Sequence, residues 1–177
     1  MKIMRAASIS CVVCLSGSGL AGTQSARADD CALVATDAWI AQAKLPHATT
    51  HVMSVPGKPP TRVEMIFSGD KVYVQMNGTW LSMAFSAQEQ IDRLNAARKR
   101  AEKATPTCQK LGSEPINGEA AALLIMRSEA NGKTSEARVW LSDKTGLVLK
   151  SEVHLDGGTV ITDNFRYGNI EVPAGVK

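Results

Sequence analysis

The stretch from Ser135 to Tyr167 constrains the fold more than any other part of this 177-residue chain. Apolar residues alternate there with polar or aromatic ones, and Asp- and Gly-rich turns at 143–146 and 156–158 interrupt the alternation. Such a pattern is typical of antiparallel strands with one buried and one solvated face. We therefore predict three consecutive antiparallel strands joined by tight turns, which form a scaffold without an evident catalytic cluster.

The rest of the chain extends this pattern and adds helices. Apolar spacings of three, four and seven predict a helix over 31–45, which Pro46 ends, and a capping box at Ser86 starts a second helix. Strands are predicted at 49–55, along a meander over 62–85 that turns at Asn77-Gly78, and at 120–129. The last of these is apolar throughout, which predicts a central strand buried on both faces. The fold class is therefore α+β, with an antiparallel meander.

The first 28 residues resemble an export signal. Lys2 and Arg5 precede a short apolar run, and Ala26-Arg27-Ala28 offers small residues where a signal peptidase cuts. We predict cleavage after Ala28, which leaves a single domain at 29–177 in the periplasm. The apolar run is too short and too rich in Ser and Gly to anchor the chain in a bilayer, so we expect no transmembrane anchor in the mature protein.

This cleavage changes how motifs and charge are interpreted. Cys11-x-x-Cys14 and the G-x-G-x-x-G match at 17–22 both fall in the predicted leader, so neither indicates a redox or nucleotide site. The leader also holds three of the 20 basic residues, so 17 remain against 17 acidic ones. A neutral mature chain argues against a nucleic-acid partner. The basic side chains of the helix that begins near Ser86 could attract anionic lipid or an acidic partner, but such charges more often form only a solvated face, which we favour here.

Two cysteines, Cys31 and Cys108, remain after the cut. In an oxidising compartment we expect them to form a disulfide, which would stabilise the fold by about 2–5 kcal/mol. The alternative is a pair of buried thiols.

Nothing in the predicted mature chain indicates an enzyme, a metal site or a cofactor. There is no G-x-S-x-G or H-E-x-x-H motif. His47 and His51 have a spacing that suits zinc on a helix, but Pro46 and the β-type run that follows argue against a helix there. We expect no catalysis, no bound metal and no cofactor.

Two segments resemble a known family. Residues Val139–Lys150 (VWLSDKTGLVLK) resemble the strand–turn–strand pattern V-W-I-D-x-x-T-G-L-P-L of the outer-membrane lipoprotein carrier superfamily, which has the LolA/LolB-like fold. The segment Phe165–Ile170, followed by Val172-Pro173, is similar to its last strand. The resemblance covers most of the predicted mature chain and points to a periplasmic branch of this superfamily. It implies an incomplete, strongly curved barrel whose concave side is covered by an N-terminal helix and a mid-chain helical insertion, and which holds an acyl chain or another apolar group.

Two functional hypotheses from different classes remain. In the first, the protein carries or senses an apolar ligand, such as an acyl chain, a lipid or a lipid-modified protein. The expected lining is the concave apolar face, formed by Val63, Met65, Phe67, Val74, Leu81, Met83, Leu124, Met126, Val139 and Leu141. Methionines suit a cavity for variable ligands, although core filling is the commoner role for any single apolar strand residue.

In the second, the protein is a non-enzymatic interaction module or accessory subunit of an envelope assembly, with an envelope protein as partner. That alternative predicts a filled core and an exposed patch near Tyr73, Trp80 and Trp140.

Overall fold

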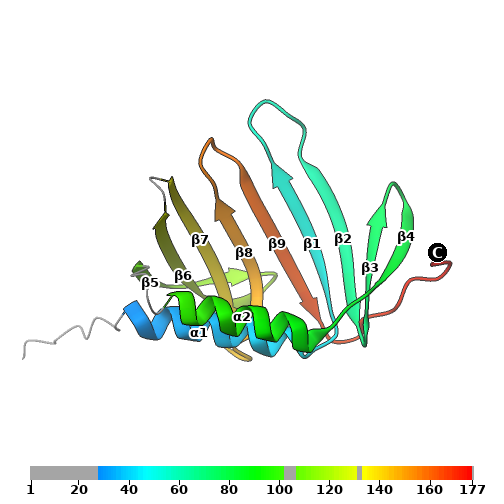
Figure 1. Cartoon of the computed structure of the whole chain (residues 1–177), viewed down its shortest axis with the longest axis horizontal. Helices are drawn as coiled ribbons and strands as arrows, with labels where there is room; N and C mark the ends of the chain where they lie inside the picture. The colour runs from blue at the N-terminus through cyan, green and yellow to red at the C-terminus, as the bar shows by residue number, and fades with distance from the viewer. Residues whose placement is uncertain (1–27, 102–106, 131–132, 177) are drawn as a thin grey trace, which may run out of the picture.

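The computed structural model describes residues 28–101, 107–130 and 133–176. They form one open antiparallel sheet of nine strands and two helices, α1 (Ala28–Ala43) and α2 (Ala87–Ala101), shown in Figure 1. The strands are β1 (His47–Ser54), β2 (Thr61–Ser68), β3 (Lys71–Met76), β4 (Thr79–Ala84), β5 (Thr107–Ile116), β6 (Glu119–Ala130), β7 (Lys133–Ser142), β8 (Val148–His154) and β9 (Val160–Tyr167). The predicted α+β class and the unclosed, curved sheet are confirmed. The predicted leader lies outside the described residues, apart from Ala28.

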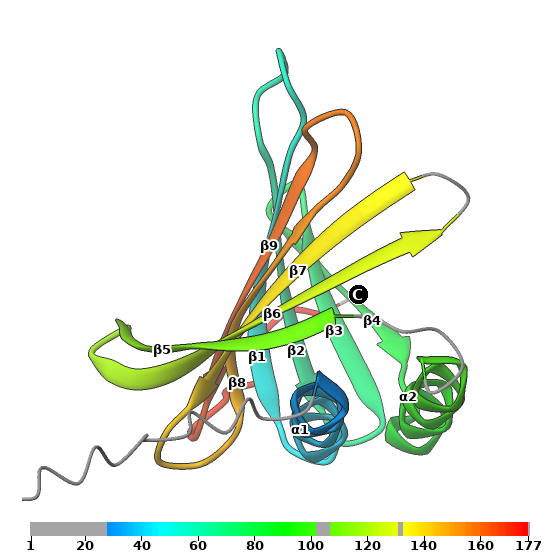
Figure 2. The same ribbon diagram turned by 90° about the vertical axis from the view of Figure 1, so that its left-hand side faces the viewer.

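The sheet consists of two meanders that meet at its centre. The strand order is β4-β3-β2-β1-β9-β8-β7-β6-β5, so the first and last strands pair with each other. Between the two meanders the chain passes from one edge strand, β4, to the other, β5, and α2 lies in this connection. Both helices lie on one face of the sheet (Figure 2). The predicted N-terminal helix and mid-chain helical insertion are therefore both present.

The hairpin between β3 and β4 forms where the sequence predicts it. Asn77 and Gly78 have φ values of 50° and 78°, the left-handed conformation that a two-residue turn requires. The predicted cap of α2 is also present, because the backbone N–H of Glu89 donates to Ser86 Oγ at 3.2 Å.

The strand register separates two faces of the sheet. Across the middle of the sheet the register aligns Leu124, Val139, Ser151, Asp163, His51 and Val63, so their side chains share one face. Leu124 and Val139 belong to the core cluster that contains residues of α1, so this is the helix-bearing face. The residues between these positions form the outer face, where Arg127 and Arg138 flank Glu136 and hold its pKa below its usual value through hydrogen bonds.

Helix α1 packs on the β5–β8 side of the helix-bearing face. Its small residues Ala35 and Ala38 are buried in one cluster with Leu124, Val139 and Leu141. Small side chains let the helix approach the sheet closely, while Trp39 meets the Phe165 ring edge-on at 5.4 Å between centroids. The resulting core extends from this side of the face to Phe165 of β9.

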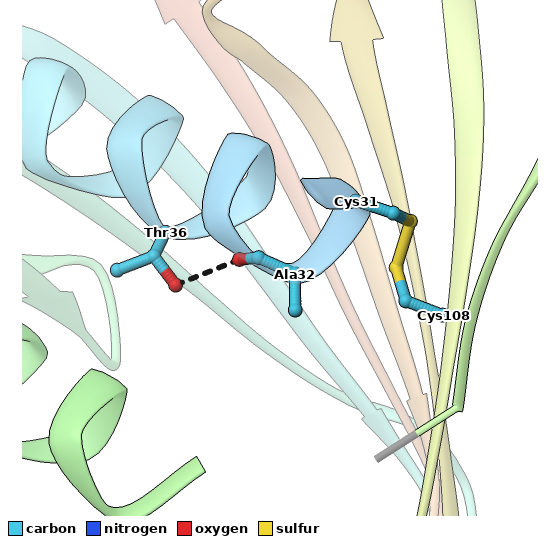
Figure 3. The surroundings of a disulfide bond; sticks show 4 residues. All are labelled: Cys31, Ala32, Thr36 and Cys108. Atoms are coloured by element: carbon cyan, nitrogen blue, oxygen red, sulfur yellow. Dashed lines mark hydrogen bonds between the residues drawn. A yellow bond between two sulfur atoms is a disulfide. The ribbon is translucent and has the colours of Figure 1, made fainter. Parts of the chain in front are cut away.

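The predicted disulfide is confirmed. Cys31, in the first turns of α1, is bonded to Cys108 of β5, and their Cα atoms are 5.7 Å apart (Figure 3). The bond joins residues that are 77 positions apart in the sequence and fixes α1 to an edge strand. Close to it, the Thr36 hydroxyl donates to the Ala32 carbonyl within the helix at 2.9 Å.

The strand predicted at 120–129 is buried on both faces but is not central. It is β6, next to the edge strand β5. Helix α1 covers Leu124 on one face, and on the other Ala121 belongs to a second cluster with Trp140 and Leu149. The prediction of a central position was wrong because the edge of this sheet has its own small core. Trp140 closes that core by donating its indole N–H to Glu114 of β5.

Candidate ligand-binding face

The register places all the residues predicted to line the concave face on the helix-bearing face. In the β1–β4 half, Met65 is paired with Val74, and Val74 is paired with Leu81. In the other half, Leu124 is paired with Val139, and Leu141 follows two positions later on β7. The alternation of apolar and polar residues in the sequence therefore identified one continuous face across most of the sheet. That these residues bind a ligand stays a prediction.

The structure divides these residues into a covered and an open group. Under α1, Leu124, Val139 and Leu141 are 3%, 2% and 5% exposed, and Met126 packs against the same cluster. These side chains fill the core. The six residues on β2–β4 are half-buried or exposed, and these are Val63, Met65, Phe67, Val74, Leu81 and Met83.

Large apolar side chains remain exposed in the β1–β4 half. Met53, Met76, Leu81 and Met83 are between 37% and 55% exposed, and the register places all of them on the helix-bearing face. With Val63, Met65, Phe67 and Val74 they form what we call the open apolar face. A solvated sheet face normally carries polar residues, so a contiguous apolar face is a candidate interaction surface. Its thioether side chains can adapt to ligands of different shape.

Helix α2 lies beside α1 rather than closely against the sheet. Arg98 of α2 pairs with Asp37 of α1 at 3.1 Å, and Ile91 and Leu94 are half-buried. A cleft of about 400 Å³ opens between the end of β4 and the start of α2. Its lining is Ala84, Phe85, Ser86, Glu89, Gln90 and Arg93, and includes none of the predicted ligand-binding residues. The exposed apolar side chains are stronger evidence for a ligand surface than this mostly polar cleft.

A polar cluster interrupts the open apolar face at the centre of the sheet. His51 of β1 and Asp163 of β9 are directly paired, and the His51 Nδ1 and Asp163 Oδ1 atoms are 2.7 Å apart. Ser151 of β8 donates its hydroxyl to the other Asp163 oxygen at 3.3 Å. The Ser151 side chain reaches the carboxylate and not the imidazole, so the three residues do not form a nucleophile–base arrangement.

The inward side of β1 is polar along most of its length. His47, Thr49 and His51 occupy successive positions on the helix-bearing face. The His47 ring stacks on Phe67 at 4.5 Å, and burial lowers its pKa although a hydrogen bond to the Leu45 carbonyl opposes this. Thr49 is 3% exposed, and its hydroxyl has no partner among the described residues. The amide oxygen of Gln42, on α1, is a second buried atom without a partner there.

Sequence reasoning considered His47 and His51 only as possible metal ligands and missed Asp163 and Ser151. In the described part of the chain, no group of three or more His, Cys, Asp or Glu residues could hold a metal ion. The signal that could have located the cluster is the alternation in β1, where polar residues stand at each inward position up to His51. Asp163 could not be found in this way because its pairing with His51 joins positions far apart in the sequence.

Comparison with known proteins gives no family model and no curated protein that matches this chain. Among solved structures, the lipoprotein LppX of Mycobacterium tuberculosis aligns with a TM-score of 0.50 at 16% identity, over 81% of this chain and 98% of LppX. MucB, solved in complex with MucA, aligns with a TM-score of 0.53 at 16% identity. The alignment covers 82% of this chain but only 60% of MucB. The chain shares the fold of LppX and MucB.

The search also finds a LolA superfamily protein from Nitrosomonas europaea, at 12% identity and a TM-score of 0.32. The alignments with LppX and MucB are consistent with the LolA-like fold that the resemblance implied, and at this identity they show the fold alone. No helix in the described ranges is long and apolar enough to cross a bilayer.

Proposed function

We propose that this protein is an exported binding protein that carries or senses an apolar ligand, such as an acyl chain, on its open apolar face. The observation that carries the proposal is the gathering of the exposed side chains of Met53, Met76, Leu81 and Met83 on the helix-bearing face. Leaving such side chains in water costs about 25 cal/mol per Å² of apolar area, and a ligand that covers them recovers this free energy. Export to the periplasm is part of the same proposal and rests on the predicted leader.

A protein segment is the second candidate occupant of this face. It is favoured by the shared fold with MucB, which was solved in complex with MucA. The patch expected for an interaction module around Tyr73, Trp80 and Trp140 receives less support, because Trp140 is only 5% exposed and its indole is hydrogen-bonded to Glu114. A protein partner would therefore compete with a lipid for the open apolar face.

Native mass spectrometry of the protein purified from an exporting host tests the proposal. We expect a reproducible adduct with the mass of a lipid that disappears after solvent extraction, and lipid analysis of the extract would give its class. The extracted protein should then bind a neutral fluorescent apolar probe. An adduct-free protein that also fails to bind the probe would contradict the proposal and leave the protein segment as the candidate ligand.

A further inference from the structure

The pairing of His51 with Asp163 determines which nitrogen of the imidazole carries a proton. An ionised carboxylate only accepts hydrogen bonds, so the His51 Nδ1 atom, 2.7 Å from Asp163 Oδ1, must donate. In the neutral imidazole the other nitrogen, Nε2, is then an acceptor. Within the described part of the chain Nε2 has no hydrogen-bond partner, and the His51 side chain is 31% exposed. The cluster thus presents His51 Nε2 as an oriented hydrogen-bond acceptor to a ligand on this face.

Thr49 provides a second polar group on the same strand face. It lies two residues before His51, which separates the two side chains by roughly 7 Å along the strand. Its hydroxyl is buried without a partner, between Phe165 and Met65 on the neighbouring strands. A buried hydroxyl without a hydrogen bond is unfavourable, and a ligand group that reaches it would remove this cost.

The charges around the cluster limit the ligands that it can accept. On this face of β1–β4, β8 and β9 the ionisable side chains are His47, His51, Asp163 and Tyr167, and neither Lys nor Arg is among them. Among these strand side chains the full charge is therefore the Asp163 carboxylate, and on the helices over this face Arg98 is paired with Asp37 and Arg93 with Glu89. An anionic head group would find no Lys or Arg on these strands to pair with and would be repelled by Asp163. An uncharged head group with O–H or N–H donors would meet an acceptor at His51 and a hydroxyl at Thr49.

From this geometry we infer that His51, oriented by Asp163, and Thr49 bind the polar head of the ligand, and that this head is uncharged and bears a hydroxyl or amide donor. The inference rests on the proposed function, because the acyl chain of the same ligand would lie on the open apolar face. The substrate class is thus neutral hydroxylated amphiphiles, of which a monoacylglycerol is the simplest example. Free fatty acids and anionic phospholipids are disfavoured.

Competition at pH 8 tests the inference. A neutral fluorescent apolar probe bound to the purified exported protein is displaced either by monomyristoylglycerol or by myristate, which have the same acyl chain. We expect the glyceride to bind about tenfold more tightly, the effect of one buried hydrogen bond. His51→Leu should abolish this preference while the probe still binds, and Asp163→Asn, which no longer fixes the Nδ1 proton, should reduce it.

His154→Leu is the matched control. His154 makes a hydrogen bond to the Glu152 carboxylate at 2.6 Å, as His51 does to Asp163, but on the outer face of the sheet. This variant should keep the full preference for the glyceride.

Each contrary result overturns the inference in a distinguishable way. Three results would overturn the role of His51 and Thr49 in binding the head group and leave the proposed function intact. They are equal binding of both lipids by the unmodified protein, tighter binding of myristate, and the same loss of preference in His154→Leu. Failure of the probe and of both lipids to bind would overturn the proposed function, and with it the role of His51 and Thr49.

Discussion

The two halves of the helix-bearing face carry similar apolar side chains, but one half is covered by a helix and the other is exposed. On β5–β8 the inward side chains are covered by α1, and Val139 is 2% exposed. On β2–β4 similar side chains lack such a cover, and Met83 is 53% exposed. The difference lies in the helices, because the disulfide fixes α1 over the covered half while α2 packs mainly along α1. Apolar alternation thus identifies the inward face, and only tertiary packing decides which part of it is core.

The largest effect that separates the two halves should come from removing the disulfide. Replacing both Cys31 and Cys108 with Ser is expected to lower the free energy of unfolding by about 4 kcal/mol, because the bond closes a long loop of the unfolded chain. Denaturant titration measures the loss. Probe binding by the protein that remains folded should change little, since the bond belongs to the covered half. A variant that keeps its stability but loses probe binding would contradict the division.

A matched pair of truncations sharpens the same comparison. Val139→Ala creates a cavity under α1 and should cost about 2–3 kcal/mol of unfolding free energy. Val74→Ala removes the same atoms from a half-buried position on β3 and should cost less than about 1 kcal/mol. The two unfolding midpoints and the two probe affinities together check this prediction. Equal stability losses would show that the β1–β4 half is packed as tightly as the covered one.

His47, which lies where the two halves meet, should give a smaller, pH-dependent effect. Burial holds its pKa below the ordinary value of 6.5, so the unfolded chain binds a proton more readily than the folded one. The stability contribution is therefore complete above pH 6.5 and is lost as the pH falls through the lowered pKa.

We expect this loss to reach at most about 1.4 kcal/mol per pH unit. His47→Phe, which keeps a ring against Phe67, should flatten the stability profile below pH 6.5. An unchanged profile in this variant would show that another group titrates.

The sequence predicted local structure well and long-range pairing poorly. Asn77-Gly78 and the Ser86 cap act over a few residues, so their turn and helix start are encoded locally. The pairing of β1 with β9 joins the two ends of the domain, and no local pattern shows it. For the same reason the His51–Asp163 contact was missed, and the apolar run at 120–129 was placed at the centre of the sheet.

The sequence was sufficient to predict which face of the sheet is apolar, but not which part of that face is covered by a helix and which is open. The alternation of Met65, Phe67, Val74 and Leu81 gives the correct side of each strand. The same alternation at Val139 and Leu141 is indistinguishable in sequence, because coverage by α1 depends on the Cys31–Cys108 bond and on small residues such as Ala35. Whether an apolar strand residue faces a helix or an open surface is a property of the packed molecule.

Probe binding by two neighbouring variants of β4 tests the central claim most directly. Leu81 lies on the open apolar face and is 38% exposed, whereas Ser82 points to the outer face of the same strand. Leu81→Glu should weaken binding of a neutral apolar probe by roughly tenfold or more, because the ligand would bury a charge, while both unfolding midpoints stay close to that of the unmodified protein. Ser82→Glu should bind the probe normally. Equal binding by the two variants would contradict the claim that the open half of this face holds the ligand.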